Sequence, residues 1–457
     1  MNRMRLLLTA VLVISSTLVL TNIPAAGQNF AYVANGQDNT VSVISTTSDM
    51  VVQTIPVANS PFGVAVTPNG KFAYVSSQSG VLTVIDTATN SVAQTFWIGG
   101  APFGLAFSPD GTKLYVTNPG YSRVTVVDPN TGNVVGLIDL SSYPYYPLEI
   151  SISPDGSRAY VTAEFTCSTV CSGSLLVFDT TSNQLSTIVP VGQAIFGVAA
   201  TRDGKHVYIA DQMGSSWDMD TSTYNVTSVP SSYGSQFPAI TPDNSKVYIT
   251  GGYGLVSAIN TSNDSLISTF SVGSGETLPY FVAITPDGKK AYISDSLGAD
   301  VAVVDTGTNE LLSKINVGGY PEQVATIPPQ PPVRFSSFQG SLQIGGNGKN
   351  FQFNGNFSLG TGSVGIHPFV DPVSLQIGSS VILVPAGSFT QASNGTYVFQ
   401  GTINGVALQM RINSASASYT FQSQGAGASG LPTNETTTVV LTIGNNTGSI
   451  TLPVHSN

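Results

Sequence analysis

Short apolar runs separated by turn-forming residues follow one another along most of the chain. Typical runs are Val84-Ile85-Asp86 and Val126-Val127-Asp128, and a typical turn is Pro109-Asp110-Gly111. Apolar runs of this length, bounded by Gly, Pro, Asn and Asp, predict β-strands, and helical periodicity is scarce. In the turns, Pro presets φ, Asp or Asn caps the turn and Gly takes the positive φ. The pattern therefore predicts an all-β protein.

A tyrosine opens one strand in each of seven successive units, at intervals of 40 to 48 residues. The seven are Tyr32, Tyr74, Tyr115, Tyr160, Tyr208, Tyr248 and Tyr292. Each unit adds three more strand-like runs, and the last, for example Gly63-Val64-Ala65-Val66, ends in a turn of the Pro-Asp-Gly kind. Four strands every roughly 40–45 residues is the spacing of propeller blades. We therefore predict a seven-bladed β-propeller of four-stranded blades over residues 28–328.

The two ends of the repeat region complement each other. The chain enters at a tyrosine strand, Phe30–Ala34, and leaves on Glu322-Gln323-Val324-Ala325-Thr326, a fourth-type run with no tyrosine strand after it. Pairing these segments completes the seventh sheet and removes exposed sheet edges, so we predict this closure. The fifth unit departs most from the pattern, with Ser216-Trp217-Asp218-Met219-Asp220 in place of a Val-Val-Asp run, and its blade geometry is less well defined by the sequence.

At Tyr115-Val116-Thr117-Asn118 the chain resembles the YVTN-type β-propeller repeat family, with Pro102-Phe103-Gly104 and Ser108-Pro109-Asp110-Gly111 just before it. The resemblance extends over about residues 29–328 and rests on seven units. It implies an extracellular or cell-surface propeller.

The last third of the chain lacks the tyrosine period. A proline-rich segment, 329–333, predicts a stiff extended linker. Residues 334–457 contain further strand-like runs, and the alternation in Val406-Ala407-Leu408-Gln409-Met410-Arg411-Ile412 suits half-buried antiparallel strands. We predict a small β-sandwich, and we assign it to no family. Candidate strands include 341–344, 351–357, 373–377, 381–384, 397–403, 407–412, 419–422, 438–443 and 449–454.

Residues 1–27 have the features of a signal peptide: Arg3 and Arg5, an apolar run from Leu6 to Leu20, and small residues before Gln28. A membrane anchor is the alternative, but the run is short and interrupted by Thr and Ser. We therefore expect a secreted, periplasmic or cell-surface protein with no membrane span in the mature chain. Residues 28–333 carry 10 Lys and Arg against 23 Asp and Glu, and an acidic body of this kind argues against nucleic acid as a partner.

The chain has two cysteines, Cys167 and Cys171. In an oxidising compartment a local disulfide is the simpler interpretation, and a metal site lacks further ligands nearby. The three histidines, His206, His367 and His455, are too few for a site of several metal ions. The number of histidines does not exclude a Ser-His-Asp triad. However, the sequence contains no GxSxG elbow, no phosphate loop and no GxGxxG motif that opens a helix.

The central channel of a propeller collects loops from every blade. Aligning the fourth-type runs places seven residues at one equivalent position: Phe62, Phe103, Leu148, Phe196, Gln236, Tyr280 and Glu322. The next position holds Gly63, Gly104, Glu149, Gly197, Phe237, Phe281 and Gln323. We predict a ligand site at this channel mouth, formed by Phe62, Phe103, Glu149, Phe196, Gln236, Phe237, Tyr280 and Glu322. In the alternative, the aromatic rings pack between blades and the acids are merely solvated.

Four tyrosines, Tyr121, Tyr143, Tyr145 and Tyr146, cluster in the third unit and form a second candidate surface. Tyrosine suits sugar stacking or protein contact, although Pro144 and Pro147 also fit a plain rigid loop.

We expect a secreted or cell-surface, non-catalytic binding protein that recognises a protein or carbohydrate through its propeller, without a cofactor unless Ca²⁺ binds at the channel mouth. The alternative is a lactonase-like propeller hydrolase with a divalent metal at that mouth, and Glu149 and Glu322 are its only support. Fold alone does not establish such an activity.

Overall fold

The computed structural model describes residues 30–143, 145–165, 173–273, 277–328, 333–345, 348–360, 366, 368, 373–385, 388–392, 396–415, 418–429, 431–432, 436–444 and 446–456. The expected signal peptide, the cysteine pair Cys167 and Cys171, Pro144 and most of the linker lie outside these residues. The described elements are strands except for one 3-10 turn, η1 (Pro119–Tyr121). No helix among them has the length and apolar character needed to cross a membrane.

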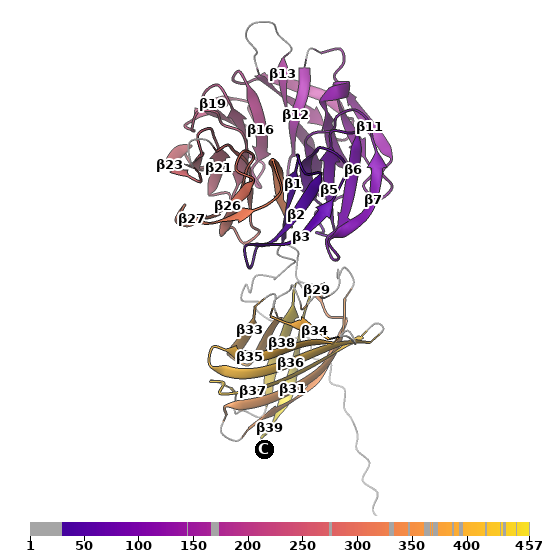
Figure 1. Cartoon of the computed structure of the whole chain (residues 1–457), viewed down its shortest axis with the longest axis vertical. Coiled ribbons are helices and arrows are strands. Elements are labelled where there is room, and N and C mark those ends of the chain that lie inside the picture. Colours follow the sequence, from indigo (N-terminus) through magenta and orange to yellow (C-terminus); the bar gives the residue numbers. More distant parts are fainter. Residues whose placement is uncertain are drawn as a thin grey trace, which may run out of the picture.

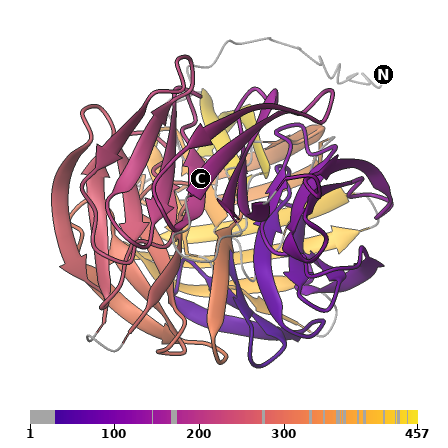
Figure 2. The ribbon, with the colours of Figure 1, turned by 90° about the horizontal axis from the view of Figure 1, so that it is seen from above.

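Seven four-stranded antiparallel sheets follow one another around a common centre, as predicted (Figures 1 and 2). In chain order, blades 1 to 3 contain β4 (Pro61–Val66), β5 (Phe72–Ser77), β6 (Val81–Asp86), β7 (Ser91–Trp97); β8 (Leu105–Phe107), β9 (Leu114–Asn118), β10 (Arg123–Val127), β11 (Val134–Asp139); and β12 (Tyr145–Ile152), β13 (Arg158–Phe165), β14 (Gly173–Asp179), β15 (Gln184–Pro190). Blades 4 to 6 contain β16 (Ile195–Ala200), β17 (His206–Asp211), β18 (Ser216–Asp220), β19 (Val226–Val229); β20 (Pro238–Ile240), β21 (Lys246–Thr250), β22 (Leu255–Asn260), β23 (Ser265–Ser271); and β24 (Pro279–Ile284), β25 (Lys290–Asp295), β26 (Asp300–Asp305), β27 (Leu311–Asn316).

Blade 7 is assembled from both ends of the repeat region. It contains β28 (Pro321–Thr326), β1 (Phe30–Asn35), β2 (Thr40–Ser45) and β3 (Met50–Pro56), in that order. Strand β28 pairs antiparallel with β1, with Val324 opposite Val33 and Thr326 opposite Ala31. The predicted closure is therefore confirmed, and β1 has a partner strand on its axial side as the other tyrosine strands do.

Burial across each blade explains the strand sequences. The tyrosine strand lies second from the axis and is packed on both faces by neighbouring blades, so β1 and β9 are buried along their whole length. The outermost strand of each blade lies at the rim of the propeller, and β7, for example, is mostly exposed. The irregular fifth unit still forms a regular blade, because β18 pairs with both β17 and β19. Its Asp218 replaces an apolar residue and is held by His206, whose Nδ1 lies 2.8 Å from the Asp218 Oδ2.

Six of the repeated tyrosines donate a hydrogen bond to the next blade. All seven side chains are at most 2% exposed. The Tyr32 hydroxyl donates to Asn90 Oδ1 (2.6 Å), the Tyr208 hydroxyl to Asp264 Oδ1 (2.8 Å), and the Tyr292 hydroxyl to Asp49. Each acceptor lies in the turn between the third and fourth strands of the following blade. Tyrosine therefore supplies a large ring for the core and a polar tip that locks neighbouring blades in register.

The C-terminal region forms one curled sheet folded over a single core, below the propeller in Figure 1. Its strands are β29 (Val333–Arg334), β30 (Ser337–Ile344), β31 (Asn350–Ser358), β32 (Val373–Ile377), β33 (Ser380–Val384), β34 (Thr390–Gln391), β35 (Tyr397–Ile403), β36 (Val406–Ala415), β37 (Ser418–Ala426), β38 (Thr436–Ile443) and β39 (Asn446–Ser456). Strand β39 pairs with β38 along Asn446–Pro453 and with β30 from Val454 onward, so it carries the sheet from one layer to the other. The result is the sandwich-like all-β domain that was predicted, formed by one curled sheet whose layers share β39.

The tyrosine bonds predict a measurable contribution to stability. The Tyr248 hydroxyl donates to Asn309 Oδ1 (2.5 Å) and lies 3.0 Å from the Thr306 carbonyl oxygen of the next blade. We expect Tyr248→Phe to lower the free energy of unfolding by about 1–2 kcal/mol, because buried acceptors lose their donor. Urea denaturation measures this change. Tyr253→Phe, at a side chain that is 66% exposed, is the control, and equal stabilities for the two variants would refute the role.

Candidate functional site

The innermost strands carry a contiguous group of aromatic rings, which we call the axial aromatic cluster. It consists of Phe62, Phe103, Phe196, Phe237, Tyr280 and Phe281. Two pairs are stacked, Phe62 with Phe103 at 3.7 Å between ring centroids and Phe237 with Phe281 at 3.5 Å. Edge-on contacts join the remaining members, among them Phe196 with Phe237 at 5.1 Å. The rings therefore pack on one another across blades and fill the centre of the propeller.

Ser or Thr hydroxyl groups two residues after the repeated tyrosine hydrogen-bond to the backbone beneath these rings. Ser76 Oγ in blade 1 donates to the Phe103 carbonyl (2.6 Å) in the segment leading into blade 2. Thr162 Oγ1 in blade 3 does the same for Phe196 (2.5 Å) in blade 4. Thr117, the third letter of the Tyr-Val-Thr-Asn sequence, bonds the Leu148 carbonyl (2.5 Å). This second layer of bonds between blades positions the residues that face the axis.

Two buried acids accompany the aromatic cluster. Glu149 in β12 is 4% exposed and Glu322 in β28 is 7% exposed. Burial raises the pKa of each carboxyl to about 8. Within the described residues, Glu149 Oε1 and Glu322 Oε2 are buried without a hydrogen-bond partner. Burial also raises the pKa of Tyr280, and the charges of Glu322 and then Glu149 raise it further, which places both acids near its hydroxyl.

A pocket of about 380 Å³ opens beside Glu322. Its walls come from the β1–β2 turn, the entry to β4, the β5–β6 turn and the entry to β28: Gly36, Gln37, Ser60, Pro61, Phe62, Gln78, Tyr320 and Glu322. Backbone bonds from Gly36 N to the Tyr320 carbonyl (2.9 Å) and from Gln37 N to the Gly319 carbonyl (3.1 Å) hold two walls together. The pocket therefore spans the junction where the two ends of the ring meet.

The structure divides the predicted channel-mouth residues into two groups. Phe62 and Glu322 line the pocket, and Phe62 also packs in the aromatic cluster. Phe103, Phe196, Phe237 and Tyr280 belong to the cluster alone, and Glu149 is buried in blade 3. Gln236 is 8% exposed; its amide oxygen accepts from Gln212 Nε2 (2.9 Å), and its own Nε2 donates to the Gly234 carbonyl (3.0 Å). Alignment of the fourth-type runs identified residues that face the propeller axis. It missed the rim of the pocket, because Gln37, Gln78 and Tyr320 lie in turns outside the aligned strands.

The predicted tyrosine surface lies on the same face of the ring, where the chain passes from one blade to the next. Tyr121, Tyr143 and Tyr146 are 40 to 49% exposed, while Tyr145 packs partly against the core of blades 2 and 3. The guanidinium of Arg123 lies 4.5 Å from the centre of the Tyr121 ring. Three of the four rings therefore remain accessible, and a cation sits beside one of them.

The described residues contain no group of three or more His, Cys, Asp or Glu side chains placed to hold a metal ion. His206 lies at the start of β17, as expected, bonded to Asp218. Burial raises the pKa of that carboxyl to about 6, partly offset by the histidine. His367 lies outside the described residues, and the described part of His455 is limited to its backbone in β39.

Comparison with known proteins supports the fold alone. No protein-family model matches the chain, and no curated protein matches it. Hydrazine synthase of Kuenenia stuttgartiensis is 19% identical, with a TM-score of 0.54 over 64% of this chain and 99% of that chain. A functionally unknown protein from Desulfotomaculum acetoxidans is 17% identical, with a TM-score of 0.55 over 66% and 100%. The dihydro-heme d1 dehydrogenase NirN, in complex with DHE, is 15% identical, with a TM-score of 0.50 over 67% and 76%.

The buried acids predict a pH dependence of stability. Because their pKa is raised from an ordinary value near 4.3, the folded protein binds more protons than the unfolded chain between about pH 4.5 and 8. The contribution of these two carboxyl groups to folding stability is therefore fully present at the acid end of this range, and it is lost as the pH rises through it.

We expect the double substitution Glu149→Gln with Glu322→Gln to leave Tm nearly unchanged at pH 4.5 and to raise it at pH 8, because an amide does not ionise. Each kcal/mol recovered corresponds to roughly 2–4 °C. Thermal melts across the range measure the effect, with Glu310→Gln, at an exposed position, as the control. If Tm changed with pH in the same way in the wild type and the double variant, Glu149 and Glu322 would not be the groups that titrate.

Proposed function

We propose that the protein is a secreted or cell-surface, non-catalytic binding protein whose propeller recognises a protein or carbohydrate ligand. The observation that carries the proposal is the pocket beside Glu322, which has the size and mixed polarity of a small-ligand site. It opens on the face where loops from successive blades meet and where the exposed tyrosines also lie.

The chemistry of the pocket favours an uncharged polar ligand. Gln37 and Gln78 are exposed at the rim and offer amide donors and acceptors. Glu322, with a pKa raised to about 8, is protonated at neutral pH and can donate a hydrogen bond as well as accept one. Phe62 supplies an apolar wall, and Tyr320, which is 46% exposed, adds an aromatic ring with a polar tip. Hydroxyl-rich sugars and backbone amides of a peptide both match this set of groups.

The exposed tyrosines extend the proposed contact surface around the ring. Tyr143 lies in the β11–β12 connection, Tyr146 at the start of β12 and Tyr121 in η1. The Leu140 amide donates to the Ser122 carbonyl (2.9 Å) and ties the connection to the loop that contains η1. Large amphipathic side chains on loops that are bonded to each other lose little conformational entropy on binding. Such a surface suits a ligand that reaches beyond the pocket.

A glycan and cell-envelope array probed with the mature protein, residues 28–457, tests the proposal. We expect at least one neutral ligand to bind, and Gln37→Ala combined with Gln78→Ala to weaken that binding about tenfold, because about 1.4 kcal/mol of hydrogen bonding is lost. Gln94→Ala, on the exposed outer strand of blade 1, is the matched control. Equal binding by all three proteins would refute the role of the pocket.

The pH dependence of the same interaction tests the part played by Glu322. Wild-type affinity should fall as the pH rises through about 8, because the ionised carboxylate loses its donor. Glu322→Gln should bind with little change across this range. An identical fall in both proteins would exclude Glu322 as the titrating group.

Metal analysis and a lactone-hydrolysis screen on the same protein address the hydrolase alternative. Stoichiometric metal together with turnover would contradict the non-catalytic proposal. Among the described residues, no group of three or more acids, histidines or cysteines that could hold a metal ion includes Glu149 or Glu322.

A further inference from the structure

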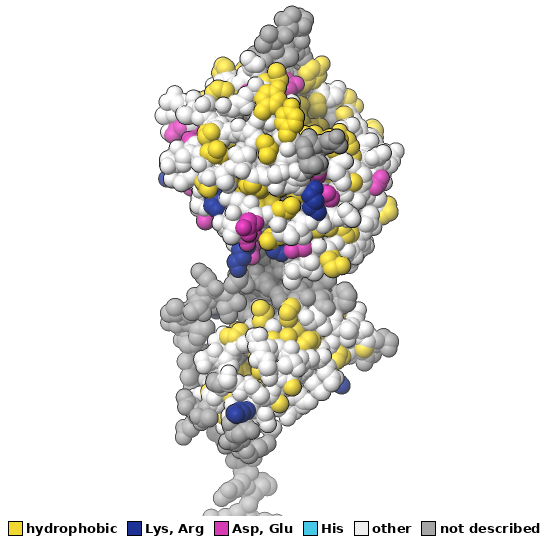
Figure 3. Space-filling model, turned by 60° about the vertical axis from the view of Figure 1, so that its left-hand side comes forward, with side chains coloured by type: hydrophobic (Ala, Val, Ile, Leu, Met, Phe, Trp, Pro, Cys, Tyr) yellow, Lys and Arg dark blue, Asp and Glu magenta, His cyan; other side chains and the backbone are white. Residues whose placement is uncertain are grey.

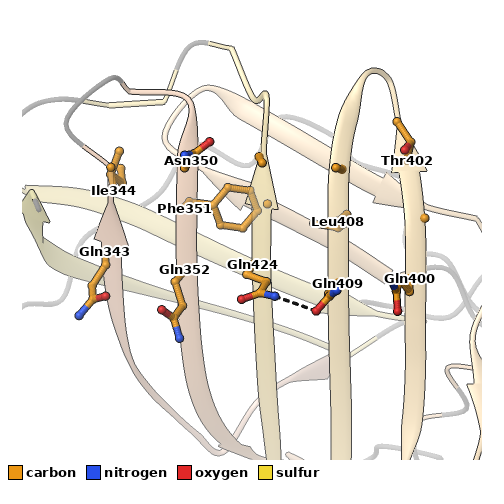
Figure 4. A pocket seen from close by; sticks show the side chains of 15 residues that line it. Gln343, Ile344, Asn350, Phe351, Gln352, Gln400, Thr402, Leu408, Gln409 and Gln424 are labelled. Carbon is orange, nitrogen blue, oxygen red and sulfur yellow. Dashed lines mark hydrogen bonds between the residues drawn. The ribbon is translucent and has the colours of Figure 1, made fainter.

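The outer face of the C-terminal sheet carries a row of five glutamines. Gln343, Gln352, Gln424, Gln409 and Gln400 come from five neighbouring strands, β30, β31, β37, β36 and β35. Each is the direct cross-strand partner of the next, so the row runs straight across the sheet (Figure 4). All five side chains are exposed. With neighbouring strands about 4.8 Å apart, the row extends over roughly 19 Å.

A groove of about 660 Å³ follows this row. On its other side the next cross-strand row holds small or polar residues: Gly345, Asn350, Ala426, Ala407 and Thr402. The residues between the two rows, among them Ile344, Phe351 and Leu408, are buried and face the core. Small side chains therefore leave a hollow beside the long glutamines, and the backbone of five strands forms its floor.

The glutamine amides are available to a ligand. Gln424 Nε2 donates to Gln409 Oε1 (2.7 Å), which aligns the centre of the row. Within the described residues, no hydrogen bond of the side chains of Gln343, Gln352 and Gln400 is present. Each amide carries one acceptor and two donors, so the row presents a regular series of both kinds of group.

The surface around the groove carries little charge. On the next row away from the groove, Ser341, Asn354, Gln422 and Val398 accompany Arg411 as the single charged side chain. Residues 334–457 as a whole hold three Lys and Arg against two Asp and Glu. In the view of Figure 3 this domain is largely white, the colour of backbone and uncharged polar side chains, in its described parts. An acidic polymer would find little to bind here.

We propose that this groove binds an extended, uncharged polysaccharide, which lies across the five strands along the glutamine row. Sugar hydroxyls both donate and accept hydrogen bonds, as amides do, and the spacing of the strands is close to the length of a sugar ring in an extended chain. A second copy of this chain fits less well, because two hollowed faces leave a gap where they meet and the glutamines find no apolar surface to bury. This site is separate from the propeller pocket and does not depend on it.

Affinity electrophoresis of the mature protein tests the proposal. Native gels contain a neutral polysaccharide (dextran, laminarin, xyloglucan or hydroxyethyl cellulose) or the acidic polymer alginate. We expect at least one neutral polymer to retard the wild type, with little dependence on salt, and alginate to leave its mobility unchanged. Retardation by alginate alone, or by none of the polymers, would overturn the proposal.

Variants locate the binding on the sheet. Gln409→Ala combined with Gln424→Ala should weaken binding at least tenfold, and Ala426→Glu, which fills the hollow while every glutamine is kept, should abolish it. Gln391→Ala, at an exposed glutamine of β34, and the propeller pair Gln37→Ala with Gln78→Ala should bind as the wild type does. Circular dichroism checks that each variant is folded.

Two results with these variants would refute the site. One is undiminished retardation of both groove variants. The other is a wild-type dimer in sedimentation velocity that Ala426→Glu converts to monomer, because the groove would then be occupied by a second copy. Loss of array binding in the propeller pair, with polysaccharide retardation intact, would show that the two sites act independently.

Discussion

The pairing of β28 with β1 is the constraint on which the rest of the propeller depends. It brings residues almost three hundred positions apart into one sheet, with Val324 opposite Val33. The same junction places Tyr320 and Glu322 against Gly36 and Gln37, and so creates the pocket. In addition, the Gln323 side chain accepts a bond from the Val64 amide (2.8 Å) and ties the closing strand to blade 1. Ring closure and the candidate binding site are therefore one structural feature.

Two concentric sets of bonds then keep the blades in register. Toward the middle of six blades, a tyrosine hydroxyl reaches the following blade, as from Tyr74 to the Pro129 carbonyl (2.5 Å). Nearer the axis, a Ser or Thr hydroxyl of blades 1, 2, 3 and 5 reaches the innermost strand of the next blade or the segment leading into it. In the Tyr-Val-Thr-Asn sequence, Tyr115 and Thr117 supply one bond of each kind, Val116 fills the core, and Asn118 Nδ2 donates to the Gly99 carbonyl (2.9 Å). Each letter of that repeat thus has a separate physical task.

The sequence predicted features that depend on periodicity. Seven tyrosines spaced like blades determined the number of sheets, and the unmatched runs at the two ends predicted how the ring closes. The alternation in 406–412 predicted β36, although the strand extends three residues further at its C-terminal end. What could not be predicted depends on contacts between loops or on register: the rim residues Gln78 and Tyr320 lie in turns of variable sequence, and the aligned glutamines of the C-terminal sheet become visible only when strand pairing is known.

Closure of the channel by aromatic rings explains why the candidate site lies off the axis. Phe62 belongs both to the axial cluster, through its stacking on Phe103, and to the pocket wall. Burial raises the pKa of both Glu149 and Glu322 to about 8, and Glu322 also lines the pocket. The pocket proposed for ligand binding thus lies within an acidic propeller, and the groove proposed on the C-terminal sheet lies in a region with few charged residues.

Hydrogen exchange of residues 28–457, followed by mass spectrometry of peptides from every blade, tests the closure most directly. Our account predicts that peptides from β28 and β1 exchange only through global unfolding, with the same protection as the tyrosine strands of blades 1 to 6. Rapid exchange of β28 and β1 while those strands stay protected would show that the ring opens at this junction, and would contradict the account.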